Sequence, residues 1–323
     1  MGKNGEERRE EMKIAYLILC HTDPKHIRRL AEKVTKGTEN EAFVHIDKKA
    51  DGPAFRQALE GLPHVHVLKN NRKVWWGGYS SVDATVRLMR AALSYNAQIC
   101  GEVERFVILQ GLDYPIRSNG EIDQFFEENP TKEFILAQNI SDSVDKKQIF
   151  KYRLYWFLDS RSPFANVLRG LTARIFLKIG WIPHLKRNYT VDNQGQRLKI
   201  YQGCAQFAIT TALAQYIVRF YDENPRVNRY FRTSYAPDES YFHTVVYNSP
   251  FVKNTPNGRA VTKPYLSDFE NLTYFEYPVT VTLFKEKKAW PKLWDSGFLY
   301  FRKASSDSRE LLDYIDQIHD RKA

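Results

Sequence analysis

Short apolar runs alternate with amphipathic segments through the first 140 residues of the chain. Residues 13–20 form a continuous apolar run between polar residues, which is typical of a buried parallel strand. Residues 25–36 follow with apolar positions at helical spacing. The same alternation predicts strands over 41–46, 64–68, 105–110 and 133–137, and helices over 53–62, 80–95 and 119–128. Strands that alternate with helices predict an α/β fold, in which helices flank a mostly parallel sheet.

Polar residues follow three of the predicted strands at the point where each strand ends. Cys20 and His21 close the first run, Asp47 follows the second, and Asp113 follows the strand over 105–110. Either aspartate alone would be explained as a cap of a turn or helix. Because ligands of parallel sheets bind at the carboxyl ends of the strands, two aspartates at one edge favour a pocket.

The alternation fades after residue 140. Residues 162–181 are amphipathic, and the pattern leaves open a core helix packed on the sheet, which we favour, or a basic helix on an anionic membrane. Further patterns predict strands over 201–209 and 297–301 and helices over 211–224 and about 308–319. The apolar stripe of this segment continues to residue 182 and consists of Phe164, Val167, Leu168, Leu171, Ile175, Ile179 and Ile182.

An acidic pair follows a proline at Pro237-Asp238-Glu239, just before an apolar and aromatic run. Proline suits the first turn of a helix, and the helix dipole favours carboxylates there. This position predicts a helix that begins near Pro237. By itself the pair favours an ordinary helix start over a catalytic site, because acidic residues are enriched at helix N-termini. A carboxylate held rigidly before a cleft is suited to general-base catalysis.

Six short motifs in the same order resemble the core-2/I-branching β-1,6-N-acetylglucosaminyltransferase family, which includes protein O-xylosyltransferases. The resemblance runs from residue 13 to about 307, and the absence of an anchor and of disulfides resembles the bacterial branch. The motifs are AYLILCH at 15–21, HIDKK at 45–49, VWWGGYS at 74–80, GLDYP at 111–115, YQGCAQF at 201–207 and YAPDE at 235–239.

This resemblance implies a GT-A-like (Rossmann-like) fold and inverting sugar transfer without a metal ion or cofactor. It implies that Glu239, beside Asp238, is the general base. Most GT-A enzymes hold a divalent cation with an Asp-x-Asp motif, and no two aspartates stand two positions apart in this chain. The family instead stabilises the departing diphosphate with cations, which maps onto Lys303 and its neighbour Arg302. Guanidinium and ammonium groups can do this electrostatic work.

The resemblance also implies the substrates and their contacts. The expected donor is a UDP-sugar, UDP-GlcNAc or UDP-xylose, and the acceptor is a glycan or glycolipid hydroxyl. No clear counterpart of the family's second diphosphate cation occurs at 272–283, although Lys285, Lys287 or Lys288 could replace it. The expected donor-binding residues are Cys20, His21, Asp47, Trp76, Asp113, Arg302 and Lys303, and the expected acceptor contacts are Lys151 and Arg153.

Length, charge and cysteine content limit the remaining choices. We expect a flexible or artificially added segment over 1–11 and one domain over 12–323, with a nucleotide-binding half (12–140) and an acceptor-binding and catalytic half (141–323). The three cysteines are widely spaced, which predicts buried free thiols in a reducing compartment. We therefore expect a cytoplasmic protein, with peripheral contact at the inner face of the membrane left open.

The net charge of +10 favours anionic partners. A non-catalytic nucleotide- or nucleic-acid-binding protein on the same fold is the alternative function. Basic residues are spread through the chain with no run of five or more, so we expect no nucleic-acid partner. An intact Pro-Asp-Glu motif would also serve no purpose in a binding protein.

Overall fold

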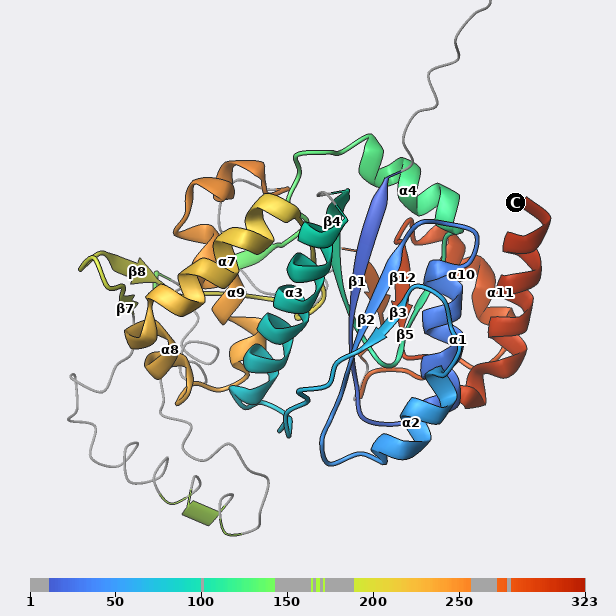
Figure 1. Ribbon diagram of the computed structural model, residues 1–323, viewed down its shortest axis with the longest axis horizontal. Helices are drawn as coiled ribbons and strands as arrows, with labels where there is room; N and C mark the ends of the chain where they lie inside the picture. Colours follow the sequence, from blue (N-terminus) through green and yellow to red (C-terminus); the bar gives the residue numbers. More distant parts are fainter. Residues whose placement is uncertain are drawn as a thin grey trace, which may run out of the picture.

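A mostly parallel sheet with helices on both faces forms the centre of the molecule (Figure 1). The computed structural model describes residues 12–99, 102–142, 189–256, 272–277 and 280–322, and the single positions 164, 167, 168 and 171. The five-stranded sheet has the order β10-β4-β1-β2-β3. Strand β1 pairs in parallel with β2 and β4, β2 with β3, and only β10 runs antiparallel. The predicted α/β fold, a mostly parallel sheet flanked by helices, is confirmed.

The first half of the chain supplies four of these five strands. In chain order it contains β1 (Lys13–Cys20), α1 (Pro24–Thr35), β2 (Glu41–Ile46), α2 (Gly52–Leu59), β3 (Val65–Val67), α3 (Ser80–Gln98), β4 (Val103–Gln110), β5 (Asp113–Pro115), α4 (Asn119–Glu127) and β6 (Ala137–Asn139).

The second half adds shorter strands and further helices. It contains β7 (Tyr189–Val191), β8 (Arg197–Lys199), β9 (Tyr201–Gly203), β10 (Ala208–Thr210), α7 (Thr211–Glu223), α8 (Pro225–Phe231), the 3₁₀ turn η2 (Pro237–Glu239), α9 (Tyr241–Tyr247), η3 (Pro250–Asn254), β11 (Thr273–Phe275), η5 (Lys287–Ala289), α10 (Trp290–Asp295), β12 (Tyr300–Arg302), η6 (Ser306–Ser308) and α11 (Arg309–Lys322).

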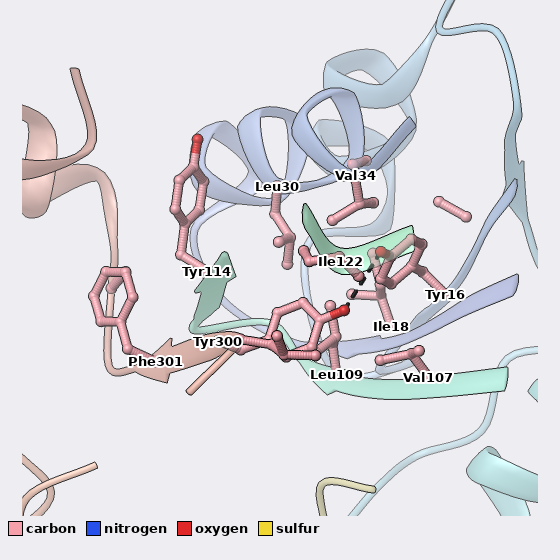
Figure 2. Close-up of a cluster of buried hydrophobic side chains, with 14 of the residues drawn as sticks. Tyr16, Ile18, Leu30, Val34, Val107, Leu109, Tyr114, Ile122, Tyr300 and Phe301 are labelled. Carbon is pink, nitrogen blue, oxygen red and sulfur yellow. Dashed lines mark hydrogen bonds between the residues drawn. The ribbon is translucent and has the colours of Figure 1, made fainter. Parts of the chain in front are cut away.

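Two buried cores lie on opposite faces of the central sheet. Alternate residues of β1 enter different cores: Tyr16 and Ile18 face the core of α1 and α11, whereas Leu17 faces that of α3, α7 and α9. Because both faces are covered, every position of β1 except Leu19 is buried, which explains its continuous apolar sequence. Figure 2 shows the first of these cores, where the hydroxyl groups of Tyr300 and Tyr16 lie 3.4 Å apart.

A second sheet, ordered β11-β12-β5, attaches the C-terminal part of the chain to the central sheet. Strand β5 follows β4 after two residues and pairs antiparallel with β12, with Arg302 opposite Asp113. The backbone N–H of Ala304 also donates to the carbonyl of Leu112 at 2.8 Å. This pairing brings β12 from the end of the chain to the carboxyl end of β4.

Most predicted elements of the first half are confirmed to within a few residues, because their caps are local. Asp23 accepts a hydrogen bond from the His26 N–H at 3.1 Å ahead of α1, and Ser118 with Glu121 forms a capping box at α4. The predicted strand over 133–137 is wrong in extent: Phe134 forms an isolated bridge, and β6 covers Ala137–Asn139.

Two other predictions for the second half need correction. The single strand over 201–209 is in fact two strands, since β9 pairs with β6 whereas β10 pairs with β4. The helix expected to begin near Pro237 is a 3₁₀ turn, η2, and α9 begins only at Tyr241. The chain changes direction at Ala236, which has a left-handed backbone with φ of 41°.

Several predictions fall wholly or mostly outside the described residues. These are the segment 1–11, both acceptor contacts Lys151 and Arg153, and most of the amphipathic segment 162–181. The four described positions of that segment are exposed, so a packed core helix is the wrong interpretation for them: Phe164, Val167, Leu168 and Leu171. No helix in the described part of the chain is long and apolar enough to cross a bilayer.

Candidate active site

A cavity of about 380 Å³ opens at the carboxyl ends of β1, β2 and β4. This is the edge where ligands of parallel sheets bind. Its walls also include the loop before α3, the first turns of α3, and residues of α9 and β12. The predicted site residues that line it are Cys20, His21, Asp47, Trp76, Asp238 and Arg302.

Close approach between β1 and β4 shapes the floor of the cavity. The N–H of Gly111 donates to the carbonyl of Leu19 at 2.8 Å, and a Cβ atom on Gly111 would lie 2.9 Å from Cys20 Cβ. Burial raises the pKa of the Cys20 thiol, so this side chain is neutral. His21 is also neutral near pH 7, because burial lowers its pKa more than the charge of Asp47 raises it. The floor is therefore uncharged.

Asp47 attaches the tryptophan-bearing loop to the end of β2. Its Oδ1 accepts hydrogen bonds from the Lys49 N–H at 2.9 Å and from the Val74 N–H at 3.2 Å. Its Oδ2 lies 3.3 Å from Lys49 Nζ, which in turn lies 4.0 Å from the centroid of the Trp75 ring. Lys49 is thus held as a cation in the cavity wall. Lys49 belongs to the HIDKK motif at 45–49, from which no role was predicted for it.

Trp76 lies at the rim of the cavity and is 63% exposed. Its ring meets that of Tyr235 edge to face, with the centroids 6.0 Å apart. The Ala236 N–H also donates to the carbonyl of Gly77 at 3.1 Å. These contacts connect the loop that carries Trp76 to the loop that carries the acidic pair.

Asp113 does not line the cavity but lies fully buried behind Arg302. Its Oδ2 accepts from the Gln110 N–H at 2.8 Å, and its Oδ1 lies 3.6 Å from Arg302 Nε. Arg302 Nη1 donates to Gln110 Oε1 at 2.8 Å. Burial raises the pKa of Asp113, and the charge of Arg302 acts against this shift. Asp113 therefore contacts the guanidinium group of Arg302 from a position that is fully buried.

The two acidic residues of η2 are half-buried and differ in position. Asp238 lines the cavity, whereas Glu239 does not. Glu239 Oε2 accepts from Gln202 Nε2 of β9 at 3.4 Å. Its charge also raises the pKa of Cys204, after the larger effect of burial, and Cys204 precedes Ala205 of the cavity wall. Glu239 thus lies beside the cavity, on the side formed by the second half of the chain.

Several expected cations lie elsewhere. Lys303 is absent from the described lining of the cavity, and its backbone N–H donates to the carbonyl of Thr282. The three candidates for the second diphosphate cation also have other neighbours. Lys285 pairs with Asp307, Lys287 lies over the Tyr314 ring, and Lys288 pairs with Glu286. Lys49 is better placed than any of them.

A family model for the Core-2/I-Branching enzyme matches residues 14–264, which include all the strands that surround the cavity except β12. The chain belongs to the Core-2/I-Branching enzyme family. Its relatives include Xylosyltransferase 2 of Rattus norvegicus, 26% identical over 246 residues, and of Homo sapiens, 27% identical over 247 residues. Each match covers 74% of this chain and 25% of the relative, so the chain spans about a quarter of their length.

Membership of the Core-2/I-Branching family and the similarity to xylosyltransferases support a glycosyltransferase. A solved structure, mouse Xyloside xylosyltransferase 1 in its apo form, shares 9% identity and a TM-score of 0.28, covering 74% of this chain and 83% of that one. A TM-score this low establishes no common fold. Among the described residues of this Core-2/I-Branching family member, no three or more His, Cys, Asp or Glu side chains gather as metal ligands would.

Proposed function

We propose that this protein is an inverting, metal-independent glycosyltransferase. It would transfer a sugar, GlcNAc or xylose, from a UDP-sugar to a hydroxyl group of a glycan or glycolipid. The observation that carries the proposal is that the wall of one cavity holds two cations, Arg302 and Lys49, together with Asp238, whose neighbour in η2 is Glu239. Family membership and the xylosyltransferase relatives add independent support.

The proposed reaction is a single in-line displacement at the anomeric carbon of the donor. The acceptor oxygen forms the new glycosidic bond while the bond to the diphosphate breaks, and UDP leaves with the bonding electron pair. Glu239 takes the proton of the acceptor hydroxyl, which contributes roughly 10²–10⁴-fold to the rate. Asp238, one residue earlier and in the cavity wall, is the second candidate for this base.

Arg302 and Lys49 would stabilise the negative charge that grows on the departing diphosphate. Arg302 suits this role because its planar guanidinium can bind two phosphate oxygens. Its position is set by Gln110 at 2.8 Å and by the buried Asp113 at 3.6 Å. A cation held in place before the reaction has no reorganisation to undergo as charge develops. We therefore assign Asp113 a positioning role, and Lys303 remains an untested candidate.

The nucleoside would occupy the part of the cavity between β2 and the loop before α3. In this proposal Trp76 stacks on the uracil ring, Asp47 accepts hydrogen bonds from the base or ribose, and Cys20 and His21 lie beside them. The lining of the cavity supports these contacts, since all four residues contribute to it. Acceptor binding by Lys151 and Arg153 and contact with an anionic membrane remain predictions.

Glu239→Gln tests the proposal because it removes the base but preserves the shape of the side chain. UDP release from UDP-xylose or UDP-GlcNAc with acceptor should fall at least about 10²-fold, while the dissociation constant for UDP stays within about twofold. Asp238→Asn is measured in parallel. Glu223→Gln, an exposed acidic residue at the end of α7, is the matched control.

The outcomes separate the alternatives. If only Asp238→Asn abolishes turnover, the base is Asp238. Full activity in both variants would overturn base catalysis by this pair. UDP binding with no turnover for any UDP-sugar and acceptor would favour the alternative of a non-catalytic nucleotide-binding protein.

A further inference from the structure

A second groove lies apart from the candidate active site, between α3 and the edge strand β3. It encloses about 430 Å³ and shares no lining residue with the first cavity. Small-molecule sites typically measure roughly 300–1,000 Å³, so its size suits a small ligand. Its residues come from β2, β3, the loop after β3 and α3.

Three cations line this groove: Lys69, Arg87 and Arg90. Its described lining contains no aspartate or glutamate. Within the described part of the chain, neither Lys69 nor Arg87 forms an ion pair with a carboxylate. Arg90 pairs with Asp222 and lies 5.5 Å from the centroid of the Tyr221 ring. Lys69 and Arg87 are therefore available to bind an anion.

The charge of Arg87 acts on its surroundings. Burial lowers the pKa of His45 to about 4, and Arg87 contributes to the same shift. Arg87 is half-buried on α3, where it is partly removed from water. A guanidinium in such a position interacts more strongly with an anion than one in bulk water does.

Aromatic rings form the floor of the groove. The rings of Phe43 and His66 stack with centroids 4.7 Å apart, and the Tyr95 ring lies 4.7 Å from that of His66. The buried Glu41 holds the rings of His66 and Tyr95 in place, since it accepts hydrogen bonds from His66 Nε2 at 2.8 Å and from the Tyr95 hydroxyl at 2.6 Å. Rings held in this way form a rigid surface on which a planar or apolar group can lie.

We propose that this groove binds a phosphate ester. Arg87 and Lys69 hold the phosphate, with Arg90 shared between the ligand and Asp222, and the rest of the ligand lies on the rings of His66 and Tyr95. Arginine binds phosphate in a bidentate manner, and lysine adds a compact positive charge. The groove is distinct from the first cavity, with which it shares no lining residue.

Calorimetric titration with two probes tests the proposal, with UDP present at saturating concentration to fill the first cavity. The probes are adenosine 5′-monophosphate, which carries a planar base, and glycerol 3-phosphate, which does not. Binding of at least one is expected. Tighter binding of the nucleotide assigns the aromatic floor to a nucleobase, whereas equal affinities assign the groove to phosphate esters in general. Failure of both to bind, or their displacement by UDP, overturns the proposal.

The double variant Lys69→Gln/Arg87→Gln should weaken probe binding at least about tenfold, because a hydrogen bond to a charged group contributes strongly. Arg226→Gln/Arg229→Gln removes the same charge from two exposed positions of α8 and should leave binding unchanged. If both double variants lose the same amount of binding affinity, the loss comes from the change in net charge, and the proposed site is wrong.

Arg87→Lys retains the charge without the bidentate geometry and should give an intermediate affinity. Thermal unfolding by circular dichroism checks that each variant is folded. If the double variant does not fold, the salt dependence of probe binding to the native protein tests the proposal instead. Binding that is equally tight at low and high sodium chloride concentrations contradicts an electrostatic site.

Discussion

Asp113→Asn removes the negative charge behind Arg302 while leaving a side-chain oxygen for the Gln110 N–H. Asp113 is fully buried, and Arg302 Nε lies 3.6 Å from its Oδ1. At that separation and an effective dielectric constant of about 20, the Coulomb attraction is about 4–5 kcal/mol. Desolvation of both groups offsets part of it, so we expect a net coupling of about 1.5–3 kcal/mol.

A double-mutant cycle measures this coupling. The free energy of unfolding is obtained from urea titrations of the native protein, Asp113→Asn, Arg302→Gln and the double variant. Each single variant should lose about 2–4 kcal/mol, since each leaves one buried charge without its partner. The double variant should be more stable than the sum of the two losses predicts, by the coupling energy.

The same variants report on the candidate site. Asp113→Asn should weaken UDP binding although Asp113 does not line the cavity, because Arg302 loses its orienting partner. Asp123→Asn, a half-buried aspartate of α4, serves as the control. Losses that add within about 0.5 kcal/mol, together with unchanged UDP affinity, would refute the positioning role of Asp113.

Three further predictions follow from the geometry. Gly203→Ala should destabilise by more than about 3 kcal/mol in thermal unfolding, because its Cβ would lie 2.0 Å from the carbonyl oxygen of Leu136, whereas Gly120→Ala, with open space around it, should be neutral or stabilising. Burial would raise the pKa of Glu41, but hydrogen bonds from two histidines and a tyrosine lower it to about 2. Its stabilisation is therefore complete above its unfolded pKa of about 4.5 and is lost as pH falls toward 2, and urea titrations of Glu41→Gln should lack this dependence. EDTA should leave UDP release unchanged. Full loss of activity with EDTA would contradict the proposal that side-chain cations, and not a metal ion, stabilise the departing diphosphate.

The order of strands and helices in the first half could be predicted because its signals are local. The apolar run of β1 reflects burial on both faces, and the caps of α1 and α4 lie within three residues of the groups they bind. The edge of the sheet where the cavity lies also follows from this order, since the carboxyl ends of parallel strands meet there.

Several candidate site residues were placed at this edge for the same reason. Cys20 ends β1, His21 follows it, and Asp47 follows β2. All three line the cavity. Lys49 stands two residues after Asp47, so its position near the end of a strand also predicts a place in the cavity wall.

The sequence by itself determined most strands and helices of the first half and which sheet edge carries the polar residues. Only the tertiary structure decided that Asp113 lies behind Arg302, and that Gln202 contacts Glu239. It also divided 201–209 between two partners, β6 and β4. Local patterns record whether a side chain is buried, but they do not record which distant strand covers it. Antiparallel pairing of β12 with β5 places Arg302 opposite Asp113, 189 positions earlier in the chain, and nothing in either segment specifies the other.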